Sequence, residues 1–355
     1  GFLTGRYQQR FGHHHNIPPK YSETNGLPVE EVTLADALHG EGYRTIALGK
    51  WHLGYAPKFH PLARGFDDFY GFLQGARSYW KLGKKQTRLN QLLRNREPIE
   101  EEFEYITDAL GLEAANYIDA HASRPFFLYL AFNATHGPLH ATQAKLETTD
   151  ASLSNRRKKL AAMTMSMDDA VGVVLEALDR NKLTDDTIIV FFNDNGGQTG
   201  LGASNAPLRG KKGQPYEGGI RVPFVAKWPG HWPAGLKVDV PVSTLDVFPT
   251  VLRAAGGDPT TLKASLDGAD LSPHLHPDAG SRPHQTLYWQ RRENVAVRDG
   301  DWKLLRHTKD GAWELYNIAA DPSEATNRVA EEPEIAARLT TLLEVWQRTH
   351  TPARW

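Results

Sequence analysis

Charged side chains follow several apolar segments of the sequence at the points where those segments end. Lys50 and His52 come directly after the apolar segment 43–49, in the stretch "GKWHLG". Gly49 and Gly54 flank this pair, and glycine leaves the backbone free to bring both side chains toward a ligand. A cation beside an imidazole suits a tetrahedral oxyanion. A solvated turn with one structural histidine would use the same residue types.

Two further histidines lie in "NATHGPLH", which follows the apolar segment 125–132. His136 and His140 have the spacing of two metal ligands on one helix face. Gly137 and Pro138 interrupt the helix that this geometry requires, so a dedicated zinc site is not expected. On its own His136 cannot be told from a structural histidine. A functional role for His136 is favoured by the polar residues that follow the other two apolar segments.

Asp194 and Asn195 follow a third apolar segment, 185–192, in the stretch "NDNGG". Their carboxylate and amide oxygens are hard ligands, which suit Ca²⁺ or Mg²⁺ rather than zinc. Two such ligands do not complete a shell of at least about six, so other ligands would have to come from elsewhere. The alternative is a turn, because turns favour Asn, Asp and Gly.

A basic, glycine-containing loop occupies residues 208–223, "LRGKKGQPYEGGIRVP". It contains four cations, Arg209, Lys211, Lys212 and Arg221. Cations on a flexible backbone could close over an anionic group of a substrate, although a solvated surface would explain an isolated basic loop equally well. The sequence contains neither a Walker loop nor a dinucleotide-binding fingerprint.

A helical pattern precedes each of the three apolar segments. Residues 33–40 show apolar spacing between a Thr cap and a Gly stop, residues 105–121 form a second candidate, and apolar residues recur at helical spacing over 160–178. Helix followed by buried strand, three times over, predicts an α/β fold with parallel strands. Ligands of such sheets bind beyond the carboxyl ends of the strands, so we expect all three polar exits at one edge of the sheet.

The pattern changes from about residue 275. Short segments of antiparallel-strand type and a final amphipathic helix lie at residues 286–290, 294–306, 313–317 and 333–349. Four tryptophans are expected to fill the core of this region: Trp289, Trp302, Trp313 and Trp346. We therefore predict an α/β domain over residues 1–274 and a smaller C-terminal α+β unit over residues 275–355.

The composition excludes several classes of protein. The 355 residues include 41 Lys and Arg against 42 Asp and Glu, so no global field favours a nucleic-acid partner or an anionic membrane. No stretch approaches the ~18 apolar residues that a membrane span needs. The absence of cysteine rules out disulfides, a thiol nucleophile and cysteine-bound zinc within these residues. The triplet at residues 13–15 could bind a metal but is expected on an exposed loop.

Seven segments, taken together and in order, resemble the formylglycine-dependent sulfatases, the arylsulfatase-like branch of the alkaline phosphatase superfamily. They are "LTGRYQQRFG", "GYRTIALGKWHLG", "NATHGPLH", "NDNGG", "LRGKKGQPYEGGIRVP", "LDVFPTVLRAAG" and "RDGDWKLL…ELYNIAADPSEATN". Each is weak alone, but the ordered set is specific and runs from residue 1 to about 330. The resemblance implies a mixed, mostly parallel central sheet flanked by helices, with a smaller C-terminal antiparallel α+β subdomain.

The resemblance also implies a role for each residue at the strand exits. Lys50 and His52 match the Lys and His that contact the nucleophile and the sulfate. His136 matches the sulfate-binding His, and Lys212 matches the Lys of the basic loop. Lys211 stands where Gly is frequent in the family, so either lysine could reach the sulfate, and we prefer Lys212.

Asp194 and Asn195 match calcium ligands of the family, with Mg²⁺ as an alternative. In that family a Cys-x-Pro-Ser-Arg signature precedes a segment like "GFLTGR", so the formylglycine, formed from Cys or Ser, is expected upstream of Gly1. An early pair of Asp residues that completes the metal site would lie there too. The resemblance therefore implies that this chain is an inactive fragment. The full-length protein would be periplasmic or secreted and activated by a formylglycine-generating or sulfatase-maturing enzyme.

The expected activity is hydrolysis of a sulfate ester. A phosphatase or phosphonate monoester hydrolase on the same scaffold is an alternative, because the same cations and metal bind phosphate equally well. A non-catalytic carbohydrate-binding relative is another. We expect a sulfated carbohydrate, including a polysaccharide, rather than a simple aryl sulfate as the substrate. The segment 77–104, which is rich in Arg and Lys, could recognise an anionic polysaccharide or could simply be solvated.

Overall fold

The centre of the molecule is a mixed sheet in which three neighbouring strands run parallel. The computed structural model describes residues 1–276 and 281–355, and within them the strand order is β4-β3-β2-β1-β5. The strands are β1 (Arg44–Lys50), β2 (Asp68–Phe72), β3 (Leu93–Arg94), β4 (Glu97–Pro98) and β5 (Phe126–Ala131). β1 pairs parallel with β2 on one side and with β5 on the other, while β3 and β4 add an antiparallel edge. The predicted mostly parallel sheet is confirmed.

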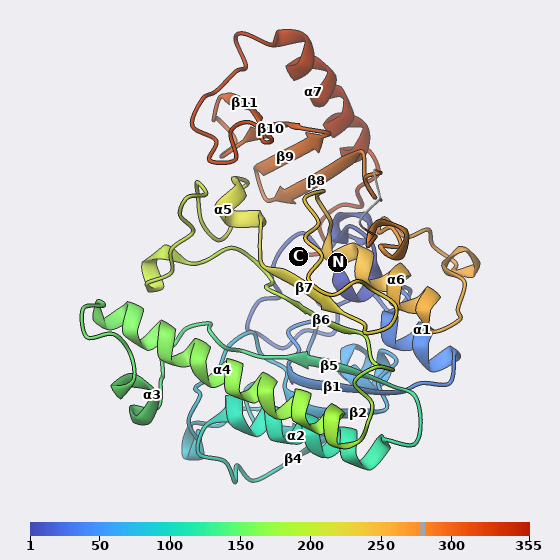
Figure 1. Ribbon diagram of the computed structural model, residues 1–355, viewed down its shortest axis with the longest axis vertical. Helices are drawn as coiled ribbons and strands as arrows, with labels where there is room; N and C mark the ends of the chain where they lie inside the picture. Colours follow the sequence, from blue (N-terminus) through green and yellow to red (C-terminus); the bar gives the residue numbers. More distant parts are fainter. Residues whose placement is uncertain (277–280) are drawn as a thin grey trace.

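Helices cover both faces of this sheet. They are α2 (Ile106–His121) and α4 (Asn155–Arg180) on one face and α1 (Leu34–Gly40) and α6 (Val247–Ala254) on the other, while the short helix α3 (Gln143–Glu147) packs on α4. Thr33 and Asp36 form a capping box that starts α1, as the Thr cap predicts. The long helix α4 lies along α2 (Figure 1), and the contact is close because a Cβ atom at Gly111 would lie only 2.8 Å from the Cβ of Ala170.

β1 is buried on both faces, as its continuous apolar run predicts. Ile46 and Leu48 pack in one cluster with Leu110 of α2, whereas Ala47 packs on the opposite face with Phe69. Successive side chains of a strand point to opposite faces, so one strand serves both layers. The site residues that follow this strand are therefore attached to the most buried part of the fold.

The third predicted strand does not join this sheet within the described residues. β6 (Ile189–Phe192) pairs only with β7 (Phe224–Lys227), in antiparallel register. The prediction of one sheet holding all three strands was therefore wrong for β6, because an apolar run predicts burial but does not specify which neighbour a strand pairs with. β5 and β6 each keep one edge without a ladder partner in the described chain. The Phe2 ring lies between these strands, 5.4 Å from that of Tyr129 and 5.3 Å from that of Phe192.

A separate antiparallel sheet forms the C-terminal part, at the top of Figure 1. Its order is β11-β10-β9-β8, and the elements are β8 (Thr286–Arg291), β9 (Asn294–Asp299), β10 (Trp302–Arg306), β11 (Trp313–Asn317) and α7 (Pro333–Gln347). α7 buries Leu339, Leu343 and Trp346 against the sheet, and the other three tryptophans pack partly buried in the same unit. The predicted α+β character of this unit is confirmed, while the boundary after residue 274 remains a prediction.

The two ends of the chain lie together (Figure 1). The Thr351 backbone N–H donates to the Gln9 carbonyl at 3.0 Å, and that of Arg354 donates to the Gly12 carbonyl at 3.0 Å. The Trp355 indole also lies with its edge against the His13 ring, 4.7 Å between centroids. In the described parts of the chain, no helix has the length and apolar character needed to cross a bilayer.

Candidate active site

Lys50 is the last residue of β1 and projects from the carboxyl end of the sheet. Gly49 before it has a φ of 94°, and a Cβ atom there would lie 2.2 Å from the carbonyl oxygen of Ala131 in β5. Only glycine permits both the left-handed backbone and this approach of the two strands. The glycine in "GKWH" therefore sets the direction in which Lys50 leaves the sheet.

His52 is held in one orientation by its surroundings. Its φ is 54°, and its Nε2 donates to the carbonyl oxygen of Ile17 at 3.1 Å. A Cβ atom at Gly75 would lie 2.4 Å from the imidazole ring, so the ring packs directly against that backbone. Because Nε2 carries the proton in this hydrogen bond, Nδ1 of the neutral ring is left as the acceptor.

His136 lies on a tight turn after β5 and is exposed. Its Nδ1 donates to the Gly137 carbonyl at 2.8 Å, so Nε2 of the neutral ring is the acceptor. The buried Tyr79 hydroxyl reaches two carbonyl oxygens of this turn, those of Asn133 at 2.5 Å and His136 at 2.8 Å. Tyr79 fixes the turn from 54 residues upstream in the chain, a contact that no spacing in the sequence could reveal.

Asp194 and Asn195 leave the end of β6 on a backbone that the basic loop supports. The Gly196 N–H donates to the Gly219 carbonyl at 3.0 Å, and the Lys212 N–H donates to the Gly197 carbonyl at 3.2 Å. A Cβ atom at Gly196 would lie 2.0 Å from the Gly218 carbonyl oxygen, so the two backbones are in direct contact. The loop that contains Lys212 therefore lies on the exit of β6.

The cations of the basic loop do not all face the same way. Lys212 is half-buried and lies near the other site residues, whereas Lys211 is exposed. Arg209 stacks on Tyr216 with 4.0 Å between the guanidinium carbon and the ring centroid, and it hydrogen bonds to Glu314. The expectation that Arg209 could close over an anion was wrong, because its charge is already used in the contact with the C-terminal sheet.

Charge interactions link five of the predicted residues. Burial lowers the pKa of Lys50, Asp194 raises it and Lys212 lowers it further. Burial also lowers the pKa of both His52 and His136, and the positive charges of Lys50 and Lys212 act in the same direction. The structure therefore brings four chain segments to one place. Two cations face one carboxylate there, and both imidazoles are neutral at neutral pH.

The described residues do not complete a metal site. Among them, no three His, Asp or Glu side chains gather to hold a metal ion. Asp194 and Asn195 offer two oxygen ligands, and Tyr129 lies near enough to Asp194 for burial and that carboxylate to raise its pKa to about 12. A calcium shell needs at least about six oxygens, so this donor set alone does not fit the ion. Calcium binding remains a prediction.

Two regions differ from the surface loops that their sequences suggest. His13 is half-buried, and burial, the Gly1 amino group and His52 lower its pKa to about 3. This histidine therefore lies near the site rather than on an exposed loop. In the loop 77–104, the buried Arg77 pairs with Glu101, so this loop is anchored rather than fully solvated.

Comparisons with known proteins agree with this geometry. Residues 1–257 match the family model described as Sulfatase, and residues 211–349 match the one described as N-sulphoglucosamine sulphohydrolase, C-terminal. N-acetylgalactosamine-6-sulfatase of Sus scrofa is 32% identical, over 90% of this chain and 64% of its own length. Arylsulfatase A of Homo sapiens is 33% identical, over 93% and 69%. The chain spans about two thirds of the length of these curated relatives.

A solved structure resembles the whole described fold. The crystal structure of Ps i-CgsB in complex with k-i-k-neocarrahexaose superposes with a TM-score of 0.91 at 34% sequence identity, covering 100% of this chain and 82% of that one. The match thus includes both the parallel sheet with its basic loop and the C-terminal antiparallel sheet. On the family match and these identities, the chain belongs to the sulfatase family.

Proposed function

We propose that the full-length protein hydrolyses a sulfate ester and releases inorganic sulfate. The observation that carries this proposal is the convergence of Lys50, Lys212, His52 and His136 around Asp194. Fixed positive charge on partly buried side chains stabilises a tetrahedral oxyanion and the charge that develops during its transfer. Membership of the sulfatase family and the names of the relatives support the same reaction.

Lys50 and Lys212 balance the negative charge of the sulfate group during its transfer. His136 protonates or stabilises the oxygen of the departing alcohol. With Nδ1 bonded to the Gly137 carbonyl, Nε2 is the atom of His136 that can hold a proton for that oxygen. Burial, together with the positive charges of Lys212 and Lys50, lowers the pKa of His136 and favours the neutral ring. A bound sulfate ester reverses this effect, since a nearby anion favours the protonated imidazole.

His52 acts as the general base. Its Nε2 proton is committed to the Ile17 carbonyl, so Nδ1 accepts a proton, and its lowered pKa keeps that acceptor available at neutral pH. We propose that the hydrated aldehyde of a formylglycine, formed from Cys or Ser by a maturing enzyme, would supply the attacking hydroxyl from a segment outside these residues, and that His52 would take the proton of its second hydroxyl so that sulfate is eliminated. The unpaired edges of β5 and β6 give such a segment a place beside the site.

Asp194 and Asn195 are proposed to hold Ca²⁺, or Mg²⁺ in its place, together with ligands from the same outside segment. The support is the hard oxygen character of both side chains and the negative charge of the Asp194 carboxylate. Chelation of the full-length protein with EDTA is expected to abolish turnover, and Ca²⁺ is expected to restore it. Undiminished turnover after chelation would remove the metal from the proposal.

The proposed substrate is a sulfated carbohydrate. One relative is named for a sulfated amino sugar, and another was crystallised with k-i-k-neocarrahexaose. In this chain Trp80 is 37% exposed, stacks at 21° to the His140 ring and follows Tyr79, which holds the His136 turn. A partly exposed indole, next in the chain to the tyrosine that holds the His136 turn, suits contact with a sugar ring. Export to the periplasm or the cell exterior is part of the same proposal.

The test uses the full-length protein and two esters of one phenol, a sulfate and a phosphate. Preferential release of sulfate, with an aldehyde found by mass spectrometry in the peptide preceding Gly1, is the expected result. Preferential release of phosphate would replace the proposal with a phosphatase. Turnover of neither ester, nor of sulfated oligosaccharides that bind, would replace it with a carbohydrate-binding protein.

A further inference from the structure

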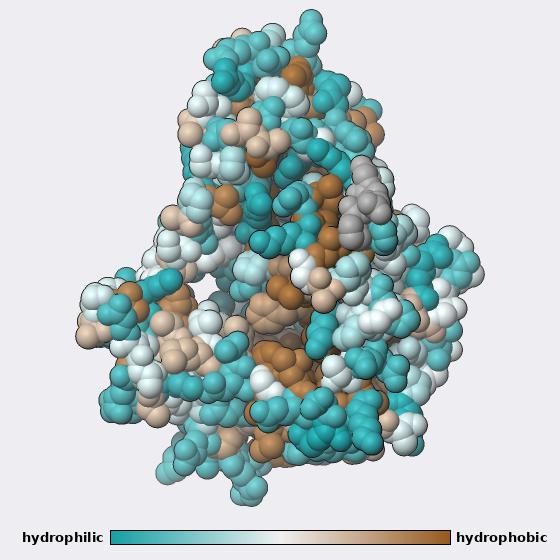
Figure 2. Space-filling model, viewed as in Figure 1, coloured by the Kyte–Doolittle hydropathy of each residue, from teal (hydrophilic) through white to brown (hydrophobic). Residues whose placement is uncertain are grey.

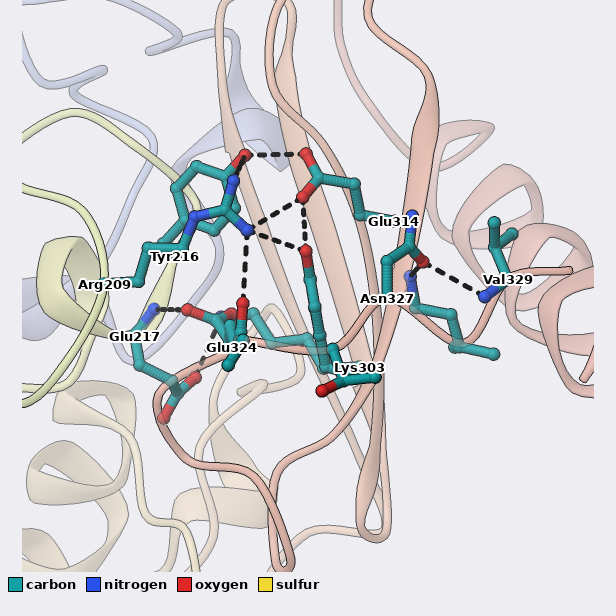
Figure 3. Close-up of polar contacts among 12 residues, drawn as sticks. Arg209, Tyr216, Glu217, Lys303, Glu314, Glu324, Asn327 and Val329 are labelled. Carbon is teal, nitrogen blue, oxygen red and sulfur yellow. Dashed lines mark hydrogen bonds and ion pairs between the residues drawn. The ribbon is translucent and has the colours of Figure 1, made fainter. Parts of the chain in front are cut away.

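A fully buried ammonium group joins the C-terminal sheet to the basic loop. Lys303 of β10 is 0% exposed, and its Nζ donates to Glu217 Oε1 at 2.8 Å and to Glu324 Oε1 at 2.9 Å (Figure 3). Glu217 is the first residue of α5 (Glu217–Ile220), within the basic loop, while Glu324 follows β11. Lys303 thus connects three segments that are far apart in the chain.

The stability of the fold does not by itself account for this ion triad. Burying charges removes their hydration, and replacement of a buried ion pair by apolar side chains is often neutral or stabilising. A buried charge network does, however, specify one relative position of the segments that carry it. Lys303 therefore suits a positional role, in which the fixed geometry of its two acceptors matters more than the energy of the contact.

The chain around Glu324 is shaped to present its carboxylate. Glu324 is fully buried and has a φ of 56°, a left-handed conformation that side chains rarely adopt. The Asp321 carboxylate accepts backbone N–H groups from Ala325 and Thr326, which fixes this turn. Glu324 Oε2 also accepts the backbone N–H of Glu217 at 2.7 Å, so one side chain holds both the start of α5 and the lysine.

A second set of contacts holds the same loop to the same sheet. Arg209 donates to Glu314 at 3.0 Å, to the Tyr316 hydroxyl at 2.7 Å and to the Glu324 carbonyl at 3.2 Å. The Tyr216 hydroxyl donates to Glu314 at 2.6 Å. Figure 3 shows both sets side by side, with Arg209 and Tyr216 on one side of Glu324 and Lys303 on the other. The loop is therefore held at two points that flank Lys212.

From α5 the connection continues directly into the site. The Gly218 N–H donates to the Arg209 carbonyl at 2.7 Å, which closes the loop around Lys212. The Gly219 carbonyl accepts the N–H of Gly196, the residue after Asn195. A displacement of α5 would move Lys212 and the Asp194 backbone relative to each other. The Lys212 N–H also donates to the Gly197 carbonyl at 3.2 Å, so such a displacement would strain this hydrogen bond.

We propose that Lys303 is a positioning residue for sulfate transfer. By bridging Glu217 and Glu324 it fixes α5 against the C-terminal sheet, and this sets the separation of Lys212 from Asp194. The proposal rests on the proposed function, because it assigns Lys303 a part in that reaction. Lys303 touches neither the substrate nor the reacting atoms, so its effect is carried entirely by the loop.

Kinetics of the full-length protein test this role. In Lys303→Met, kcat is expected to fall about 10²-fold with a smaller change in KM, since a misplacement of about 1 Å far from the chemistry can cost that much. Lys303→Arg should recover part of the loss by keeping the charge. Arg338→Gln is the matched control, because it removes an ion pair of the C-terminal unit, with Asp299, that does not reach the loop. Equal kcat values for Lys303→Met and Arg338→Gln would overturn the proposal.

A double variant separates position from stability. If Lys303 acts through Lys212, Lys303→Met should lower kcat much less in a Lys212→Ala background than in the wild type. Independent effects that multiply would overturn the proposal. Should Lys303→Met fail to fold, Glu217→Gln keeps a neutral acceptor and should lower kcat in the same direction. Unchanged kcat in Glu217→Gln would overturn the proposal that Lys303 positions the basic loop through Glu217.

Amide hydrogen exchange provides a readout that does not depend on activity. Peptides containing the Gly196, Lys212 and Gly218 amides should exchange faster in Lys303→Met and at the wild-type rate in Arg338→Gln. Unchanged exchange in Lys303→Met would overturn the proposal even if the wild-type protein proves inactive on sulfate esters. If the wild type is inactive on sulfate esters and Lys303→Met still exchanges faster, the proposed function is refuted. The contact of Lys303 with Glu217 and Glu324 then remains only a structural link between α5 and the C-terminal sheet.

Discussion

Lys211 and Lys212 are adjacent cations in very different surroundings. Lys212 is half-buried and depresses the pKa of Lys50, His52 and His136, whereas Lys211 is exposed. In the full-length protein, Lys212→Ala is expected to lower kcat/KM by ~10²- to 10³-fold, the usual cost of losing one preorganised charge contact. Lys211→Ala should change it little. Initial rates on one sulfate ester measure both.

A larger loss of kcat/KM in Lys211→Ala than in Lys212→Ala would assign the sulfate contact to Lys211, which stands where the family often has glycine. The Lys212→Ala variant has a second readout. Removing its charge should raise the pKa of His136, and an NMR titration of the imidazole measures that change. An unchanged titration midpoint would show that Lys212 does not reach the site.

That the predicted residues of the candidate site come together could be expected from the sequence, whereas the contacts that hold them could not. Lys50, His52 and His136 stand where apolar runs end, and the carboxyl ends of parallel strands meet at one edge of a sheet. Tyr79 and Gly75 come from segments with no distinguishing pattern. Their contacts depend on the packing of one chain segment against another, which periodicity does not encode.

The helix pair α2 and α4 offers two glycines in opposite situations. A Cβ atom at Gly111 would lie 2.8 Å from Ala170 Cβ and 2.9 Å from its carbonyl oxygen, whereas at Gly172 nothing lies within 4 Å. Gly111→Ala should lower the free energy of unfolding by ~1–3 kcal/mol through overpacking. Gly172→Ala should raise it by ~0.5–1 kcal/mol, because glycine is a poor helix former. Urea denaturation of both variants measures the difference.

A stabilising effect of Gly111→Ala would mean that the two helices can separate without loss of stability, contrary to their close contact.

The elements themselves follow the sequence well, because a capping threonine and regular apolar spacing are local signals. α1 begins after Thr33 and α2 ends at His121, close to the predicted limits. The pairing of β6 with β7 was not predictable, since partner choice is a property of the assembled sheet.

Three wholly or partly buried histidines that stay neutral in the fold make the whole molecule sensitive to acid. The pKa of His60 and that of His350 are lowered to about 4, and that of His13 to about 3, each mainly by burial. Below the unfolded value of 6.5, the unfolded chain binds protons that the folded chain does not. The free energy of unfolding should therefore fall as the pH drops from about 6.5 to 4.

Urea denaturation at pH 7 and pH 5 measures this dependence of the free energy of unfolding on pH. His60→Asn is the informative variant. His60 Nδ1 accepts the Leu62 N–H at 3.3 Å, and asparagine can replace that cap without titrating. The variant should lose less stability between the two pH values than the wild type. An identical loss would show that His60 is not among the groups responsible.

At the scale of the molecule, the two units were predictable as units but their cooperation was not. The change from long helices to short antiparallel strands is visible in the sequence near residue 275. The role of Lys303 is not, because a lysine in "DWKLLR" is normally expected to be solvated. Only the fold places it between two glutamates and next to the basic loop.

The hydrogen bonds between the chain ends have a consequence for the order of folding. The Thr351 hydroxyl donates to the Arg10 carbonyl across 341 residues, and the segment that it holds leads to Ile17, whose carbonyl orients His52. Contacts of such separation carry a large loop-closure entropy and form late. The contacts with residues 351–354 cannot form until that part of the chain has been synthesised, whereas Arg10 can already pair with Asp267. The final orientation of the His52 imidazole, just after β1, is therefore expected late in folding.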